Sequence, residues 1–182
     1  MRSHTLAILV ISAGLSTAAV VFLRPSPIEF IWLVPLVAWI IFVVFGLARW
    51  VARWQNLYVA RKIIHILSGG VVAFLAPYLF ETPAIPIIGG VGMFSLTMLP
   101  RLRGRRFDWF QVEGNLGEVW FCVTWTLVMA GLWYVDLNSG VAATLFMSVG
   151  DGVTGIVRNK VYGRWGKGLA GSVAMLLSLI HI

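Results

Sequence analysis

A single carboxylate lies among small residues in the stretch SVGDGVTGIVRNKVYGRWGKGLAGS, which covers residues 148–172. Asp151 stands between Gly150 and Gly152, and Gly155 follows one helical turn later. Small residues at this spacing serve ordinary helix packing, which explains the glycines without explaining the aspartate. A carboxylate in an apolar segment is costly unless it is paired or solvated. Helix packing therefore leaves Asp151 unexplained, and we regard it as a candidate functional residue.

Basic and glycine residues follow this carboxylate in a predicted loop over residues 158–167. Glycine-rich backbone combined with cations is a common phosphate-binding arrangement. The chain has neither a GxxxxGK[ST] loop nor a GxGxxG motif, so the prediction depends on this loop alone. The candidate phosphate-binding residues here are Arg158, Gly163, Arg164 and Lys167.

A second basic group lies in VARKIIHILSGG, where Arg61, Lys62 and His65 follow at spacings i, i+1 and i+4. On a helix, His65 neighbours both Arg61 and Lys62. Two interpretations stay open: cations that flank a membrane segment, or a contact for an anion or phosphate. In the second interpretation His65 is a hydrogen-bond donor or a proton carrier near neutral pH.

Further acids occur in FQVEGNLGEVWF, where Glu113, Asn115 and Glu118 surround a predicted helix start. Acids near a helix N-terminus are favoured by the helix dipole, which accounts for Glu113. The dipole accounts less well for Glu118, which leads directly into an apolar run. Carboxylate and amide oxygens suit Mg²⁺. Glu118 is therefore a candidate metal ligand and catalytic residue, and Asn115 is a candidate cofactor contact.

No HExxH or CxxC motif is present, and no Ser/His/Asp arrangement can be argued from the sequence. Transition-metal and acyl-hydrolase chemistry therefore have no support. Phosphoryl transfer needs mainly positioning, charge stabilisation and a base that orients the attacking hydroxyl. Carboxylates that hold Mg²⁺, cations that neutralise a triphosphate and a bilayer that delivers an oily substrate would together supply these needs.

The elements that must position these residues are apolar helices. Of the 182 residues, 59% are hydrophobic and 12% are charged, and the mean hydropathy is +0.90. Soluble domains have about twice that charged fraction, so we expect an all-α, polytopic membrane protein with one integral membrane domain over residues 1–182. The net charge of +7 lies in short loops and does not indicate nucleic-acid binding. Cys122, the only cysteine, is expected to be a small buried apolar residue.

We expect about seven apolar segments, several of them near the roughly 20 residues that span a bilayer. Proline and glycine interrupt the fourth, which is either a kinked span or a segment shielded by protein. The first is expected to be a retained helix and not a secretory signal, because its apolar run is long. The seventh stops in mid-pattern, which predicts a truncated sequence. The segments cover residues 5–23, 28–48, 63–80, 84–99, 116–135, 138–157 and 168–182.

The charged residues predict the topology. With the N-terminus in the cytoplasm, 13 of the 14 Lys and Arg residues face the cytoplasm and only Arg24 lies outside, in line with the positive-inside rule. Glu118 and Asp151 fall inside apolar segments, on the same cytoplasmic side. The candidate site is therefore expected to face the cytoplasm, from which a nucleotide would reach it.

Three stretches resemble the membrane family of CTP-dependent lipid-alcohol kinases: RKIIH (61–65), GNLGE (114–118) and GDGVTGIVRNKVYGR…GKGLAGS (150–172). This family contains dolichol, phytol, farnesol and yeast-type diacylglycerol kinases, and it is distantly related to CTP:phosphatidate cytidylyltransferases. The resemblance is patchy over roughly residues 58–175, and the last stretch is its most specific part. The family pattern Gly-Asp…Gly…Lys-x-x-x-Gly-Ser is matched by Gly150, Asp151, Gly155, Gly163, Lys167, Gly171 and Ser172.

The resemblance implies transfer of the γ-phosphate of CTP, or of another nucleoside triphosphate, to the hydroxyl of a membrane lipid. It implies that residues 150–172 form the nucleotide side of the site. Asp151 would be a metal ligand or base, and Arg164 and Lys167 would contact phosphates. The residues that would line the same cytoplasmic cavity are Arg61, Lys62 and His65.

Two departures from the family pattern are visible. Ala170 stands where many members have Glu, and members continue with further spans beyond the point that corresponds to Ile182. Two alternatives to the kinase stay open. One is a cytidylyltransferase that makes a CDP-lipid, although the long SKR…KD…D signature of those enzymes is not found. The other is a small transporter or lipid-binding membrane protein in which Asp151 and Glu118 line a pathway.

Overall fold

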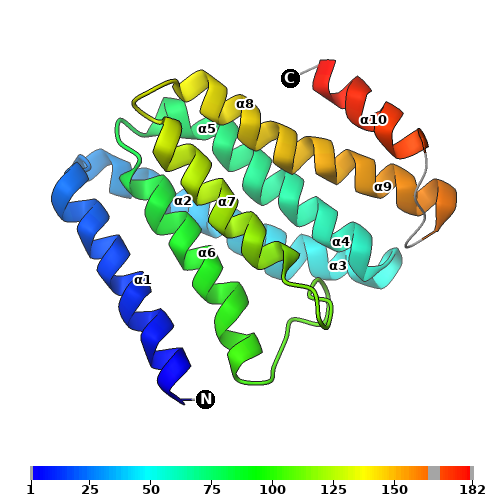
Figure 1. The fold of residues 1–182 in the computed structure, drawn as a ribbon, viewed down its shortest axis with the longest axis horizontal. Coiled ribbons are helices and arrows are strands. Elements are labelled where there is room, and N and C mark those ends of the chain that lie inside the picture. The colour runs from blue at the N-terminus through cyan, green and yellow to red at the C-terminus, as the bar shows by residue number, and fades with distance from the viewer. Residues whose placement is uncertain (1, 164–168, 181–182) are drawn as a thin grey trace. The chain divides into compact units, whose positions relative to one another are not determined.

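The computed structural model describes residues 2–163 and 169–180 (Figure 1). Every regular element in those residues is helical, which confirms the predicted all-α class. The elements in chain order are α1 (Arg2–Leu23), α2 (Pro27–Ile41), η1 (Phe42–Leu47), α3 (Ala48–Trp54), α4 (Leu57–Ile64), η2 (His65–Gly70), α5 (Val71–Leu79), α6 (Ala84–Leu102), α7 (Gly117–Leu132), α8 (Leu137–Leu145), η3 (Phe146–Gly150), α9 (Asp151–Tyr162) and α10 (Leu169–Ile180). The three η elements are π-helical turns inside longer helices.

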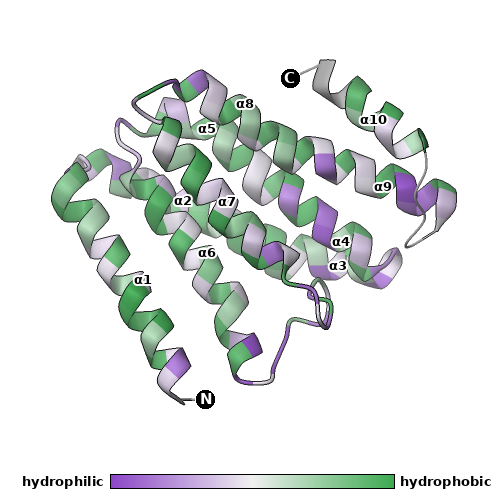
Figure 2. Ribbon diagram, viewed as in Figure 1, coloured by the Kyte–Doolittle hydropathy of each residue, from purple (hydrophilic) through white to green (hydrophobic). Residues whose placement is uncertain are grey.

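Among the described residues, five continuous helices are long and apolar enough to cross a membrane, which indicates a membrane protein. They are Ser3–Leu23, Pro27–Trp54, Leu57–Leu79, Ala84–Leu102 and Leu137–Tyr162. Helix α7 is also apolar but shorter, at 16 residues. Hydrophobic residues dominate the helices in Figure 2, and hydrophilic residues gather in the connection between α6 and α7 and towards the end of α9.

The helices extend beyond the predicted apolar segments at several ends. The fourth segment is a continuous helix of 19 residues, α6, and its Pro86 lies in the first turn, where proline removes no needed hydrogen bond. The predicted loop at 158–167 starts later, because Arg158 and Lys160 still belong to α9. A helix can continue past the apolar core of a bilayer, so hydropathy alone places helix ends too early.

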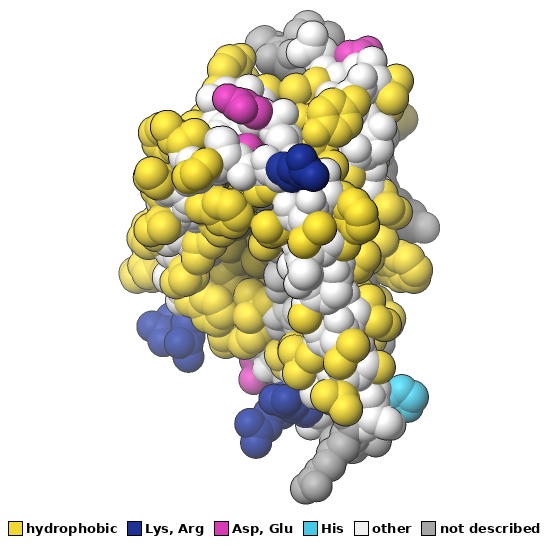
Figure 3. Space-filling model, turned by 90° about the vertical axis from the view of Figure 1, so that its left-hand side faces the viewer, with side chains coloured by type: hydrophobic (Ala, Val, Ile, Leu, Met, Phe, Trp, Pro, Cys, Tyr) yellow, Lys and Arg dark blue, Asp and Glu magenta, His cyan; other side chains and the backbone are white. Residues whose placement is uncertain are grey.

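Large apolar side chains are exposed along α1, among them Leu6 at 63%, Val10 at 62% and Phe22 at 81%. The face drawn in Figure 3 is largely covered by hydrophobic side chains. Soluble monomers rarely expose apolar patches of such extent. In contact with lipid, these apolar side chains are not exposed to water, so the surface carries no hydration penalty.

The chain divides into two compact units, and each is described by itself. Unit 1 comprises Met1–Val34, Ala76–Phe107 and Gln111–Gly140, and unit 2 comprises Pro35–Leu75, Asp108–Phe110 and Val141–Ile182. In unit 1, α6 packs against both α1 and α7. In unit 2, α4 packs against α3 and α9, η2 packs against η3, and α10 packs against α9.

The buried Glu29 carboxylate links two interhelical connections of unit 1. Glu29, at the start of α2, is completely buried. It accepts a hydrogen bond of 2.9 Å from the backbone N–H of Ser26 and one of 3.2 Å from the Thr82 hydroxyl. The segment before α2 is thereby held to the segment before α6. The Thr82 N–H also donates to Glu29, at 3.4 Å, and the burial of Glu29 together with these donors gives it a structural role.

Candidate functional site

Two π-helical turns of unit 2 bring His65 and Asp151 to the ends of adjacent elements. In η2, the Val71 N–H bonds to the Ile66 carbonyl, and in η3 the Asp151 N–H bonds to the Phe146 carbonyl. These i→i+5 bonds widen the helix by one residue, and such turns occur frequently at functional sites. Since η2 packs against η3, His65 and Asp151 lie at neighbouring points of two long helices.

The start of α4 is fixed by Asn56. Its side-chain oxygen accepts a hydrogen bond of 3.0 Å from the Val59 N–H, which satisfies one of the free donors of the first turn. Its side-chain nitrogen donates a bond of 3.0 Å to Oδ1 of Asn159 in α9. Asn56 therefore caps α4 and links it to α9, which fixes the position of the two helices along each other.

The central feature of unit 2 is a cluster of three residues, Asp151, Lys62 and His65, which we call the Asp151 cluster. The Lys62 ammonium donates to Oδ2 of Asp151 at 2.6 Å, and Nδ1 of His65 lies 3.5 Å from the same oxygen. The side chains of Lys62 and His65 are 9% and 7% exposed, whereas that of Asp151 is 51% exposed. Lys62 thus holds one oxygen of the carboxylate, with the buried His65 ring beside it, while about half of the Asp151 side chain is exposed.

Two glycines let α9 approach α4 and η2 at this cluster. A Cβ at Gly152 would lie 2.4 Å from Cγ1 of Ile66, and a Cβ at Gly155 would lie 2.3 Å from Cε of Lys62. Atoms this close overlap, so any larger residue would force a neighbour to move. The glycines therefore serve helix packing, and the close packing that they permit also brings Lys62 within reach of Asp151.

The other predicted residues of unit 2 differ in exposure. The buried ones are Gly150, Gly155 and Gly171, the half-buried ones are Arg61 and Arg158, and the exposed ones are Gly163 and Ser172. Gly163 ends α9 with a φ of 78°, which favours glycine. A Cβ at Gly171 would meet the Arg158 side chain at 2.3 Å, so α10 packs directly on that arginine. Arg164 and Lys167 lie outside the described residues.

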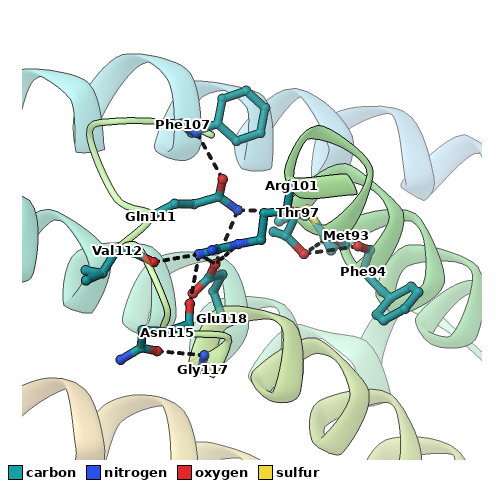
Figure 4. A network of polar contacts seen from close by, with 10 residues as sticks. All are labelled: Met93, Phe94, Thr97, Arg101, Phe107, Gln111, Val112, Asn115, Gly117 and Glu118. Atoms are coloured by element: carbon teal, nitrogen blue, oxygen red, sulfur yellow. Dashed lines mark hydrogen bonds and ion pairs between the residues drawn. The ribbon is translucent and has the colours of Figure 1, made fainter. Parts of the chain in front are cut away.

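The second polar cluster lies in unit 1 around Arg101, in the last turn of α6 (Figure 4). Its guanidinium donates to Oε1 of Glu118 from Nε at 2.9 Å and also from Nη2. Nη2 donates further to the carbonyls of Val112 at 3.1 Å and Asn115 at 2.8 Å. Gln111 donates from Nε2 to the same Glu118 oxygen at 3.2 Å. We call these residues the Arg101 network.

The Arg101 network gives Glu118 and Asn115 structural partners. Glu118 is 4% exposed and paired with a cation, and the Asn115 side chain accepts from the Gly117 N–H at 2.8 Å at the start of α7. Within the described residues no three His, Cys, Asp or Glu side chains form a group that could hold a metal ion. The geometry therefore favours Asp151 over Glu118 as the residue available to a ligand.

The structure buries polar groups that sequence reasoning missed, among them those of Gln111, Thr97, Ser68 and Ser148. Gln111 is 1% exposed and Thr97 is 2% exposed, and the Gln111 amide donates to the Thr97 carbonyl at 3.0 Å. The buried hydroxyls of Ser68 in η2 and Ser148 in η3 have no hydrogen-bond partner among the described residues. The two serines and Thr97 are isolated polar residues in apolar runs, which is their only sequence signal, and Gln111 lies in the polar connection between α6 and α7 without any distinguishing signal.

Known proteins offer no match to this chain in the comparisons that we made. No protein-family model, curated protein or solved structure was found to match the chain. The resemblance to the lipid-alcohol kinases therefore stands on the quoted motifs, and what it implies about function is a proposal.

Proposed function

We propose that this chain is a multi-pass membrane kinase that transfers the γ-phosphate of CTP, or of another nucleoside triphosphate, to the hydroxyl of a lipid alcohol. The observation that carries the proposal is the half-exposed Asp151 carboxylate, held by Lys62 next to His65 at the start of α9, within a membrane-length apolar helix. A carboxylate kept in such a segment is unfavourable and marks a functional site by default. The GDGVTG motif that carries the family resemblance contains this same residue.

The residues present fit a magnesium nucleotide. Mg²⁺ typically binds through one or two carboxylates together with substrate phosphates and waters, and one half-exposed carboxylate meets that need. Bound there, the ion would neutralise charge on the transferred phosphoryl group. Asp151 would hold the ion or orient the lipid hydroxyl, and His65 would keep the carboxylate in place. Arg158 lies two turns further along α9 and is a proposed phosphate contact, as are Arg164 and Lys167.

The lipid substrate is favoured by the setting of the cluster. The helices that carry Lys62 and Asp151 are both long and apolar enough to cross a membrane, so a site between them would open towards the bilayer. An alcohol with a long hydrocarbon tail can present its hydroxyl there while its tail stays in lipid. A cytoplasmic orientation of the site, with the N-terminus in the cytoplasm, belongs to the same proposal and follows from the distribution of Lys and Arg.

The test is label transfer by the purified full chain in lipid nanodiscs. The protein is incubated with Mg²⁺, γ-labelled CTP or ATP, and a panel of polyprenol, phytol and diacylglycerol. We expect label in a lipid monophosphate and none when EDTA replaces Mg²⁺. Absence of label from every lipid, with folded protein present, contradicts the proposal. Label that enters lipid from α-labelled CTP with release of pyrophosphate identifies the cytidylyltransferase alternative.

A transporter is the second candidate, and the ion pair between Lys62 and Asp151 in two membrane-length helices favours it. Ionisable pairs inside membrane-length helices often mark ion or substrate pathways, and His65 beside the pair could carry a proton. This candidate predicts substrate-dependent flux in proteoliposomes without nucleotide turnover. The kinase proposal predicts turnover without flux, so one preparation measured in both assays separates them.

A further inference from the structure

We propose that Lys62 is a positioning residue for the Asp151 carboxylate, and not a phosphate contact, and that Gly155 is the residue that permits this. The inference rests on the proposed function, because it assigns Lys62 a role within the same site. It departs from the sequence-based expectation, in which Lys62 lines the nucleotide cavity.

The course of the Lys62 side chain carries the argument. A Cβ at position 155 would lie 2.3 Å from Cε, 2.9 Å from Cδ and 3.0 Å from Cγ of Lys62. The lysine stem therefore runs directly across the bare Cα of Gly155, and its ammonium emerges 2.6 Å from Oδ2 of Asp151. Only a residue without a side chain at 155 leaves this route open.

The surroundings of the ammonium also favour a positioning role. The Lys62 side chain is 9% exposed, and its ammonium lies 5.5 Å from the centre of the Tyr58 ring, within the range of a cation–π interaction. A lysine that binds a phosphate from solution needs its ammonium in reach of that solution. Here the buried stem, the aromatic ring and the carboxylate all direct the ammonium to Asp151.

The two oxygens of Asp151 have different environments. Lys62 and His65 both approach Oδ2, while the side chain as a whole is 51% exposed. Oδ2 is therefore the anchored oxygen, and Oδ1 is the oxygen that a metal ion or a substrate hydroxyl would meet. Loss of the Lys62 contact would free the carboxylate to rotate, which would misplace Oδ1.

Replacement of Gly155 by Ala is the critical perturbation. The new methyl group would overlap the far end of a flexible side chain, so the fold can accommodate it by moving the lysine. The ammonium would then leave Asp151 while its charge remains in the protein. Gly131→Ala is the matched control, since a Cβ at Gly131 meets nothing within 4 Å and its φ is not in the positive range.

The experiment compares wild type, Gly155→Ala, Lys62→Ala and the double variant in the γ-label assay. We expect each single variant to lower kcat about a hundredfold, the usual scale for misplacement by about 1 Å, with KM for the nucleotide changed by less than about threefold. Lys62→Ala removes the stem that the new methyl group at position 155 would meet, so the double variant should match Lys62→Ala within about twofold. Gly131→Ala should match wild type.

Several outcomes overturn the inference. Losses that multiply in the double variant show that Gly155 does not act through Lys62. A raised KM with unchanged kcat indicates uniform binding and restores the phosphate contact. If Lys62→Ala does not insert into the membrane, the comparison of Gly155→Ala with Gly131→Ala takes its place. Equal kcat values for these two variants would then contradict the inference.

A wild-type chain that transfers no phosphate would remove the proposed function and would leave the Lys62–Asp151 contact, with its dependence on Gly155, to be tested by itself. Thermal unfolding of the same four chains then decides the contact independently. Gly155→Ala should lower the unfolding midpoint of wild type more than it lowers that of Lys62→Ala. Equal decreases in the two backgrounds would overturn the inference.

Discussion

Removal of the Arg101 side chain tests the assignment of Glu118 to a structural role. Arg101→Met keeps most of the apolar stem and removes the guanidinium, which donates to Glu118 and to the carbonyls of Val112 and Asn115. The two charged side chains are only 14% and 6% exposed. Removal of one partner of a buried pair costs about 3–5 kcal/mol, and we expect a loss of unfolding free energy in that range.

The assay is reversible unfolding in mixed detergent micelles, with Arg103→Met as the matched control. Arg103 is exposed, two residues further along the chain, so its replacement should change the unfolding free energy by less than about 0.5 kcal/mol. A second variant, Arg101→Met with Glu118→Gln, should recover part of the loss because no buried charge is left without its counter-ion.

Equal effects of Arg101→Met and Arg103→Met would refute this reasoning. So would a double variant that is less stable than Arg101→Met alone. Either result would mean that Glu118 does not depend on Arg101 in the folded protein, and Glu118 would again be a candidate metal ligand.

Two further predictions concern packing and hydrogen bonding in unit 1. Gly90→Ala should lower the unfolding free energy by about 1–3 kcal/mol, since its Cβ would lie 1.8 Å from Oγ1 of Thr126. The control is Gly89→Ala, whose Cβ meets nothing within 4 Å and which should be neutral or stabilising by up to about 1 kcal/mol. Equal losses of unfolding free energy in the two variants would contradict the contact between α6 and α7. Thr82→Val should cost about 1 kcal/mol in the same assay, because the buried Glu29 carboxylate loses a hydroxyl donor, and an unchanged unfolding free energy would show that this bond contributes nothing.

The sequence was sufficient for the helical architecture because membrane-length apolar runs have few alternatives to helix. It was less reliable at the helix ends. The predicted segment 63–80 starts six residues after α4 does, at Leu57, because polar residues extend the helix and Asn56 caps it. The three π-helical turns had no sequence signal, and the residues that flank them have ordinary α-helical φ and ψ angles.

The Asp151 cluster could be predicted in part. The spacing of Lys62 and His65 placed both on neighbouring positions of one helix, and Asp151 was singled out as an acid in an apolar run. That these residues meet, 89 positions apart in the case of Lys62 and Asp151, depends on which helices pack together. Spacing within one helix carries no information on that choice.

The Arg101 network could not be predicted from the sequence. From the sequence alone, Arg101 is one of four arginines in a loop that is predicted to be cytoplasmic, and Glu118 is an unexplained acid in an apolar run. The structure pairs them across a separation of 17 residues. The positive-inside rule counts charges near a membrane without distinguishing solvated arginines from arginines that fold back onto a buried acid.

The most direct test of the central claim is γ-label transfer to lipid by Asp151→Asn beside wild type. Asn keeps the shape of the side chain and removes its charge, and Asp136→Asn, at an exposed position before α8, is the control. We predict that Asp151→Asn inserts and folds but loses at least about a thousandfold in turnover, on the scale seen when essential catalytic groups are removed. Turnover at the wild-type rate in Asp151→Asn would contradict the account.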